Sequence, residues 1–199
     1  SIFNPNGGKE FITINAQAKR IGEQSEKQPS VILATACYPY KTIFGTSVCV
    51  DTDVYGIRQG QKACNVATLD FKNGQGAPVA VTKVETRILP QDGKDGNKVK
   101  PLFLIHIENK GNGEVVKLSK TGDACTKKAL DYRDFNTILI SASLSGKPLD
   151  CRINKDDPEA EPPPPAPAVI RLRDKKFMVR CILKDDGIDA DIDAYITAL

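Results

Sequence analysis

Residues 99–116, VKPLFLIHIENKGNGEVV, predict a strand followed by a glycine-rich turn. Apolar and polar side chains alternate along the first part at the period of two that a half-buried strand requires. The apolar face carries Phe103, Ile105 and Ile107, and the opposite face carries His106 and Glu108. The following NKGNG supplies residues that tolerate positive φ, so we expect a turn there, with the next extended segment starting at Glu114.

The order of these features resembles the opening hairpin of immunoglobulin-like modules on bacterial and archaeal surface proteins. A hydrophobic strand, Glu-Asn, a Gly-Asn-Gly turn and a second strand are most similar to the CARDB-type adhesion-related domains. The resemblance covers roughly residues 75–199. It implies an Ig-like antiparallel β-sandwich and a structural or adhesive role at a cell surface. It implies no particular ligand, because such domains serve many functions.

The rest of the C-terminal half also predicts strands, so the expected fold class is all-β. Residues 78–89 form a long strand antiparallel to residues 99–107, with Val84 and Ile88 facing inward. Further strands are expected at 136–144, 149–153, 169–173 and 176–183, and the last two form a hairpin around Asp174 and Lys175. Residues 121–132 hold one expected helical turn, and the last apolar residues near Tyr195 suggest a short helix or a strand.

Changes in composition divide the chain into three parts. Residues 1–28 contain a short strand signal and a polar linker, and residues 29–74 form a small Cys-rich β region with expected strands at 31–37, 46–51 and 62–71. The glycine-rich KNGQGAP then marks the join to the sandwich at residues 75–199. Within the sandwich, residues 158–168 are a proline-rich loop that favours polyproline II and reads as an exposed connector rather than an SH3-type ligand.

Six cysteines indicate disulfides formed in an oxidising compartment, and hence an extracellular location. They are widely spaced, without a Cys-x-x-Cys pair, and a single histidine argues against a Cys/His zinc site. Cys151 and Cys181 lie in two expected strands that flank the proline loop, so we predict that they bond. The pairing of the other four stays open: Cys37 and Cys49 face each other across an expected hairpin, or either reaches Cys64, and Cys125 completes the set.

Two groups of aspartates are candidates for calcium, which prefers several oxygen ligands from a loop. Asp51 and Asp53 form the first group, for which an Asx-type turn is the simpler interpretation. Asp189, Asp191 and Asp193 form the second, which resembles the start of a calcium loop but lacks the expected glycine and closing glutamate. A solvated acidic loop is the default there. We therefore expect no metal or other cofactor, with calcium as the exception to test.

Several functional classes are disfavoured. With 28 basic and 25 acidic residues the net charge is only +3, and no basic patch with aromatic platforms indicates nucleic acid. No run of 18 apolar residues predicts a membrane span. Because His106 is the only histidine and no catalytic motif is present, we expect no enzyme.

Two functional hypotheses remain. The first is a subunit of a filament, pilus or surface layer, in which the isolated strand signal of one copy completes the sheet of the next. That assembly strand consists of Phe11, Ile12, Thr13, Ile14 and Asn15. The second is a monomeric module that binds carbohydrate or another surface protein through Tyr38, Tyr40 and Tyr55. For these tyrosines the simpler interpretation is that they cover the small core of the N-terminal region.

Overall fold

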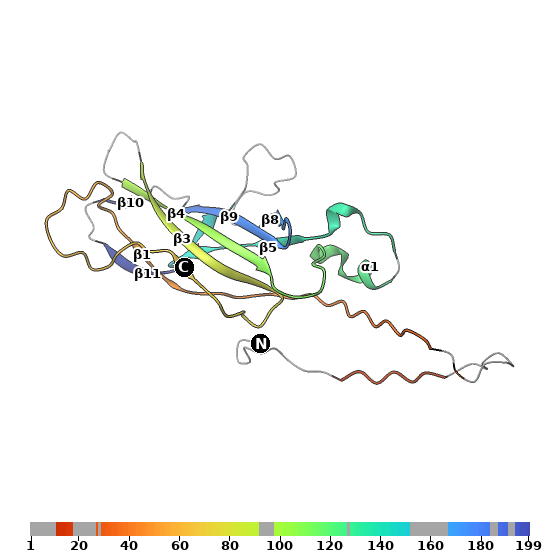
Figure 1. The fold of residues 1–199 in the computed structure, drawn as a ribbon. Coiled ribbons are helices and arrows are strands. Elements are labelled where there is room, and N and C mark those ends of the chain that lie inside the picture. The colour runs from red at the N-terminus through yellow and green to blue at the C-terminus, as the bar shows by residue number, and fades with distance from the viewer. Residues whose placement is uncertain are drawn as a thin grey trace.

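The chain is all-β and antiparallel (Figure 1). A computed structural model describes residues 11–17, 27, 29–91, 98–126, 128–151, 167–183, 187–190 and 194–199. The strands are β1 (Ser47–Val50), β2 (Leu69–Asp70), β3 (Val79–Gln91), β4 (Lys98–Asn109), β5 (Thr137–Ile140), β6 (Ser143–Leu144), β7 (Lys147–Asp150), β8 (Ala168–Arg171), β9 (Lys176–Leu183), β10 (Ile188–Asp189) and β11 (Tyr195–Ala198). The described helices are short: the 3-10 turns η1 (Leu118–Lys120) and η2 (Tyr132–Asp134), and α1 (Thr121–Cys125).

The long β3–β4 hairpin is the centre of the fold, as the alternation of residues 99–107 predicts. The two strands pair from Val79 opposite Asn109 to Gln91 opposite Lys98. A register shift between Val81 and Lys83 leaves the edge of β3 irregular. The side chain of Gln75 takes the part of a neighbouring strand at Val81. Its Oε1 accepts a hydrogen bond from Val81 N at 2.8 Å, and its Nε2 donates one to Val81 O at 2.9 Å.

The chain leaves β4 differently from the expected hairpin. Neither Gly111 nor Gly113 adopts positive φ; instead the Asn109 side chain closes the turn, accepting from Gly111 N and donating to the carbonyl of Gly113. Val116 then bridges Phe135 rather than returning along β4. The hairpin prediction at this point is wrong because the carboxamide of Asn109 satisfies the backbone locally and sends the chain away from the sheet.

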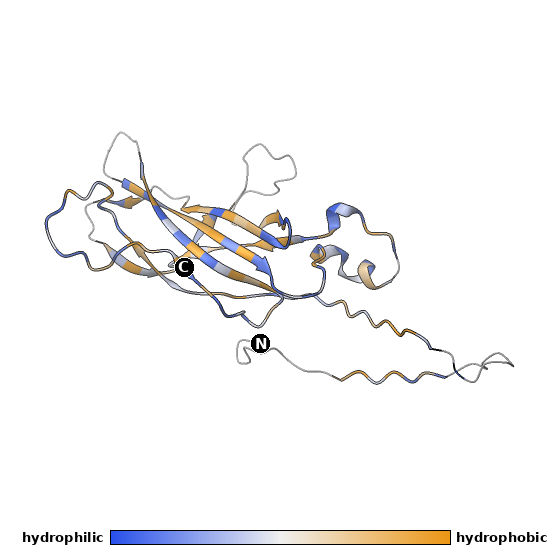
Figure 2. Cartoon of the chain, viewed as in Figure 1, coloured by the Kyte–Doolittle hydropathy of each residue, from blue (hydrophilic) through white to orange (hydrophobic). Residues whose placement is uncertain are grey.

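One hydrophobic core joins three sheets into a sandwich-like arrangement. The main sheet has the order β2-β3-β4-β9-β7-β6, with β10 added beside β4, and two smaller sheets pair β1 with β11 and β5 with β8. Buried side chains from all three sheets pack in one cluster, from Val48 on β1 through Phe103 on β4 to Ile170 on β8 and Val179 on β9. The alternation of orange and blue along β3, β4 and β9 in Figure 2 follows this division between core and solvent.

The expected hairpin at residues 169–183 forms only at its tip. Asp174 and Lys175 adopt positive φ, and Arg173 and Lys176 exchange two backbone hydrogen bonds of 2.9 and 2.8 Å. Beyond that tip β8 pairs with β5, whereas β9 pairs with β4 and β7. The two strands therefore belong to different sheets, and their buried side chains pack in the core between those sheets. The expected strand at 136–144 is likewise divided into β5 and β6.

The N-terminal third differs most from expectation. Residues 31–37 are not a strand, and of the expected strand at 62–71 only β2 forms. β1 forms as expected but pairs with β11, the last strand of the chain, and β2 pairs with β3. Backbone pairing thus crosses the glycine-rich join at residue 74. The helical turn expected near Cys125 is α1, and among the described residues no helix is long and apolar enough to span a bilayer.

Candidate functional site

Two apolar segments protrude from the sandwich without packing against it (Figures 1 and 2). In residues 11–17 the side chains of Phe11, Ile12 and Ile14 are 93, 80 and 73% exposed. These residues, Thr13 and Asn15 included, belong to no described sheet, so the strand signal at 11–15 finds no partner within the described chain, and its pairing with another copy stays a prediction. Their alternation has no partner there on which to form a ladder, and an isolated strand has no hydrogen bonds to hold it.

The second segment, residues 29–37, is named the arm below. Val31, Ile32 and Leu33 are 85–89% exposed, which makes them the most exposed of the large aliphatic side chains that the structure describes. Consecutive apolar residues place apolar side chains on both faces of an extended segment, a pattern typical of strands covered on both sides. The strand predicted at residues 31–37 does not form in the single chain, where these side chains stay exposed.

The base of the arm is fixed to the sandwich. Cys37 is bonded to Cys125 of α1. A few residues later the hydroxyl of Tyr40 donates to the carbonyl of Gly76, and Thr42 Oγ1 donates to Val79 O at 3.0 Å. The arm is thus attached at its C-terminal end, while its apolar residues point into solvent.

The β5–β8 sheet presents an open backbone edge. The register pairs Ile138 with Ile170, and the bond from Leu172 N to Asn136 O (2.7 Å) continues the same ladder. Hydrogen-bonded and non-bonded pairs alternate in an antiparallel sheet, so the N–H and C=O groups of Val169 and Arg171 point away from β5. Within the part of the chain that the structure describes, no strand pairs with that side of β8.

Apolar side chains accompany this edge. Leu139 and Val169 lie opposite each other and are 48 and 43% exposed. The guanidinium of Arg171 lies over the ring of Tyr132, 5.2 Å from its centroid, and donates to the Tyr132 carbonyl. Sequence reasoning missed this edge because residues 169–173 and 176–183 read as one hairpin, in which the second strand would pair with the first.

The outer face of the main sheet holds a separate polar cluster around the single histidine. His106 Nε2 lies 2.9 Å from Glu85 Oε1, and Lys83 Nζ lies 2.9 Å from the same oxygen. Hydrogen bonds from Lys83 and His106 lower the pKa of Glu85. A shallow pocket beside the cluster is lined by Thr82, Glu108, Lys176 and Met178 among others. The arrangement resembles a surface ion-pair group, in which the Arg87 guanidinium also lies 3.7 Å from Glu85 Oε2.

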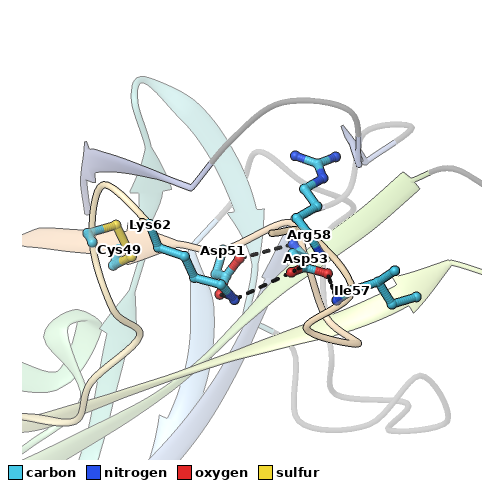
Figure 3. A network of polar contacts seen from close by, with 7 residues as sticks. Cys49, Asp51, Asp53, Ile57, Arg58 and Lys62 are labelled. Carbon is cyan, nitrogen blue, oxygen red and sulfur yellow. Dashed lines mark hydrogen bonds and ion pairs between the residues drawn. A yellow bond between two sulfur atoms is a disulfide. The ribbon is translucent and has the colours of Figure 1, made fainter. Parts of the chain in front are cut away.

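The Asp51 and Asp53 calcium candidates are occupied by the protein itself (Figure 3). Asp53 accepts from the backbone amides of Ile57 (2.9 Å) and Arg58 (3.1 Å), and Asp51 accepts from Asp53 N. Lys62 Nζ lies 2.6 Å from Asp51 Oδ2 and 3.7 Å from Asp53 Oδ2. This is the Asx-type turn that the sequence favours.

These contacts shift the ionisation of the loop. The amide of Ile57, together with that of Arg58 and the Lys62 ammonium, lowers the pKa of Asp53. The hydrogen bond to Asp51 raises the pKa of Lys62. Both shifts favour the charged forms of Asp53 and Lys62. The carboxylates of the loop therefore already accept hydrogen bonds from amides and pair with an ammonium group, rather than being oriented toward a bound cation.

The remaining candidates for calcium are only partly described. Asp189 lies in β10 opposite Lys98, whereas Asp191 and Asp193 fall outside the described residues. Among the side chains that are described, no three His, Cys, Asp or Glu residues gather as a metal site. Most of the proline-rich loop, up to residue 166, is also outside the described ranges.

All six cysteines are in disulfides. The structure joins Cys151, directly after β7, to Cys181 within the neighbouring strand β9, and this is the pair expected from the sequence. Cys49 bonds to Cys64, one of the alternatives that the sequence left open, and Cys37 to Cys125. No free thiol remains.

The three candidate contact tyrosines are on the surface. Tyr38, Tyr40 and Tyr55 are 59, 45 and 75% exposed, so the interpretation that they cover a small N-terminal core is wrong. Tyr38 and Tyr40 lie edge to face with ring centroids 6.1 Å apart, directly after the arm.

Comparison of the chain with models of protein families, with curated proteins and with solved structures found no match.

Proposed function

We propose that this chain is a non-enzymatic structural or adhesive protein of a cell surface, and that it is a subunit of an extracellular filament, pilus or surface layer. The observation that carries the proposal is the pair of exposed apolar segments, residues 11–17 and the arm, held outside a disulfide-bonded sandwich. Each subunit gives these segments to a neighbouring copy, where they add to a sheet.

The free energy available from covering these segments supports assembly. Burial of a Val, Leu or Ile side chain is worth about 1.5–3 kcal/mol, so Val31, Ile32 and Leu33 together hold roughly 5–9 kcal/mol that the single chain does not use. Association costs and the ordering of the arm reduce this sum.

The disulfides support an extracellular location. Three disulfides in a chain of this size are characteristic of an oxidising compartment. Two of them lie in the region that carries the arm, where Cys37–Cys125 fixes its base.

The polar groups support a non-enzymatic role. His106 is engaged with Glu85, and the paired cysteines leave no thiolate for nucleophilic chemistry. The Asp51–Asp53–Lys62 group is saturated by its own contacts.

Removal of residues 1–17 tests the assembly function. We expect the full chain to form ordered oligomers or filaments in electron microscopy and size-exclusion chromatography, and the truncated chain to elute as a monomer. The unfolding midpoint should not change, since residues 11–17 pack against nothing described.

A matched pair of variants separates apolar contact from chain length. F11S/I12S/I14S should behave like the truncation, whereas T13S/N15Q in the same segment should assemble like the full chain. A full chain that is monomeric at all concentrations, with its six cysteines oxidised, would contradict the assembly function.

The exposed tyrosines favour one alternative, a monomeric module that binds a glycan or another surface protein. Tyr38 and Tyr40 present two exposed rings side by side, and rings of this kind combine apolar area with a polar tip. This alternative expects a monomer that binds on a glycan array and loses binding in Y38A/Y40A. The absence of any hit, with and without calcium, would remove it.

A further inference from the structure

We infer that the arm of one copy adds as a strand to the open edge of β8 in a second copy. The inference rests on the proposed assembly and names its donor and acceptor. Both halves of the contact are on this chain: an exposed apolar segment, and an edge of β8 that no described strand pairs with and that has exposed apolar side chains beside it.

The backbone of the arm is suited to a ladder. Pro29 and Pro39 bound it, and residues 30–38 contain no proline, so every N–H between them can donate. Val169 and Arg171 offer two N–H and two C=O groups on the open side of β8. A segment of six residues extends about 20 Å, which is longer than the four residues of β8 and covers its full length.

The side chains of the arm suit both faces of that edge. On β8, Ala168 and Ile170 face the core, and Val169 and Arg171 face solvent. A strand placed beside β8 has one row of side chains next to each of these rows. Residues 31–36 of the arm, VILATA, offer apolar or small side chains in both rows. A strand with only one apolar face would offer them in one row only.

The electrostatics agree with this pairing. Residues 29–40 contain no charged side chain, so the arm brings no charge into the contact. The Arg171 guanidinium on the acceptor is already engaged with Tyr132 and need not be desolvated without a partner. Charged side chains are the usual protection of an exposed edge, and Val169 provides none at the centre of this one.

A second copy is the occupant that fits because the arm and the β5–β8 sheet lie toward the same end of the molecule (Figure 1). α1, to which the arm is bonded through Cys125, shortly precedes Tyr132 and β5 in the chain. Two copies that meet at this end bring each arm near the β8 edge of the other and so form a closed pair, which needs a second contact to extend into a larger assembly. The contact of residues 11–17 adds to this one, since a single short strand buries less area than a stable interface needs.

Photo-crosslinking of the full-length protein tests the pairing directly. Benzoylphenylalanine replaces Ile32, and light and heavy-isotope copies are mixed, allowed to assemble and irradiated. We expect light–heavy crosslinks from position 32 to residues 167–171 or to the neighbouring Leu139. Crosslinks confined to one copy, or reaching only other surfaces of the second copy, would overturn the inference.

Charge substitutions give an independent readout. L33K on the donor and V169K on the acceptor should each raise the concentration needed for half-assembly by about tenfold or more, which corresponds to the loss of a few buried contacts. S30K is the control on the arm and V169T the control on the edge, and both should assemble like the unmodified chain. Circular dichroism and the unfolding midpoint confirm that each variant is folded.

The outcomes separate this inference from the proposed function. If the unmodified chain assembles while L33K and V169K assemble equally well, the arm-to-β8 pairing is wrong and the assembly function stands. If the unmodified chain never assembles, both fail together.

Discussion

A few side chains organise the backbone where regular pairing stops. Asp53 accepts hydrogen bonds from two amides of the following turn, Asn109 closes the turn after β4, and Gln75 completes the ladder of β3 at its register shift. Each of these carboxylate or carboxamide groups satisfies backbone groups that would otherwise lack partners. Asp53, which the sequence offers as a calcium ligand, therefore has a structural role in its turn.

The Asp53 turn should make the loop around it sensitive to acid. The pKa of Asp53 is lower in the folded chain than its ordinary value of about 3.9. Its stabilisation is therefore fully present above the unfolded pKa and is lost as the pH falls through the folded pKa. We expect D53N to unfold at lower denaturant than the unmodified chain at pH 6, and the difference to vanish at strongly acidic pH.

Denaturation curves at a series of pH values check this expectation. Asn keeps one acceptor oxygen but cannot serve both amides and Lys62 as a carboxylate does. D70N is a control, because Asp70 lies in β2 away from this turn. A difference between D53N and the unmodified chain that is constant with pH would show that charge is not involved. Added calcium should leave all midpoints unchanged.

At the scale of elements, long alternating strands were predictable and short ones were not. Residues 176–183 alternate over most of their length, and the burial of β9 follows that pattern. In the middle of β4, residues 101–105 are apolar throughout and buried on both faces of the sheet. The segment at 136–144 alternates equally well but is divided, because Ser145 and Gly146 form a tight turn and Ala142 O accepts from Leu149 N. The period of the side chains does not specify which sheet a strand joins.

The arm shows a different limit of sequence reasoning. Its composition predicts a strand, and nothing in that composition says whether the partner lies in the same chain. The open edge of β8 was not predictable either, because it results from β8 and β9 leaving their shared turn for different sheets. Tertiary pairing, rather than local propensity, decides both features.

The β7–β9 disulfide should contribute strongly to stability because it joins neighbouring strands across a long excursion. Cys151 and Cys181 are buried and 30 residues apart, and closure of such a loop is worth about 3–4 kcal/mol in the chain-entropy model. We expect C151A/C181A to lose about that amount of unfolding free energy, with some addition for the space left in the core. Equilibrium denaturation with oxidised protein measures the loss.

A comparison of disulfides controls for the general effect of removing a crosslink. C49A/C64A removes a bond that closes 15 residues beside an exposed loop, so its loss should be smaller. Equal or greater destabilisation by C49A/C64A would show that loop length and burial do not govern the contribution here.

At the scale of the whole molecule, the first and the last described strands pair with each other. β1 pairs with β11 from Ser47 opposite Ala198 to Val50 opposite Tyr195, and Thr46 and Leu199 exchange two further backbone bonds. Val48 and Val50, both buried, are thereby held on the core by the last strand of the chain. The Cys-rich region is consequently part of the sandwich at β1, whereas its arm projects from the sandwich.

This arrangement predicts opposite effects for truncation at the two ends. Deletion of residues 195–199 removes the only described sheet partner of β1 and uncovers Val48, so we expect a loss of about 3 kcal/mol or more of unfolding free energy. Deletion of residues 1–17 should leave the unfolding free energy unchanged and abolish assembly instead. Urea denaturation and size-exclusion chromatography on the same two truncations distinguish the roles. If the C-terminal truncation were as stable as the full chain, β1 would not depend on β11; if the N-terminal truncation were destabilised, residues 11–17 would belong to the fold rather than to the contact between copies.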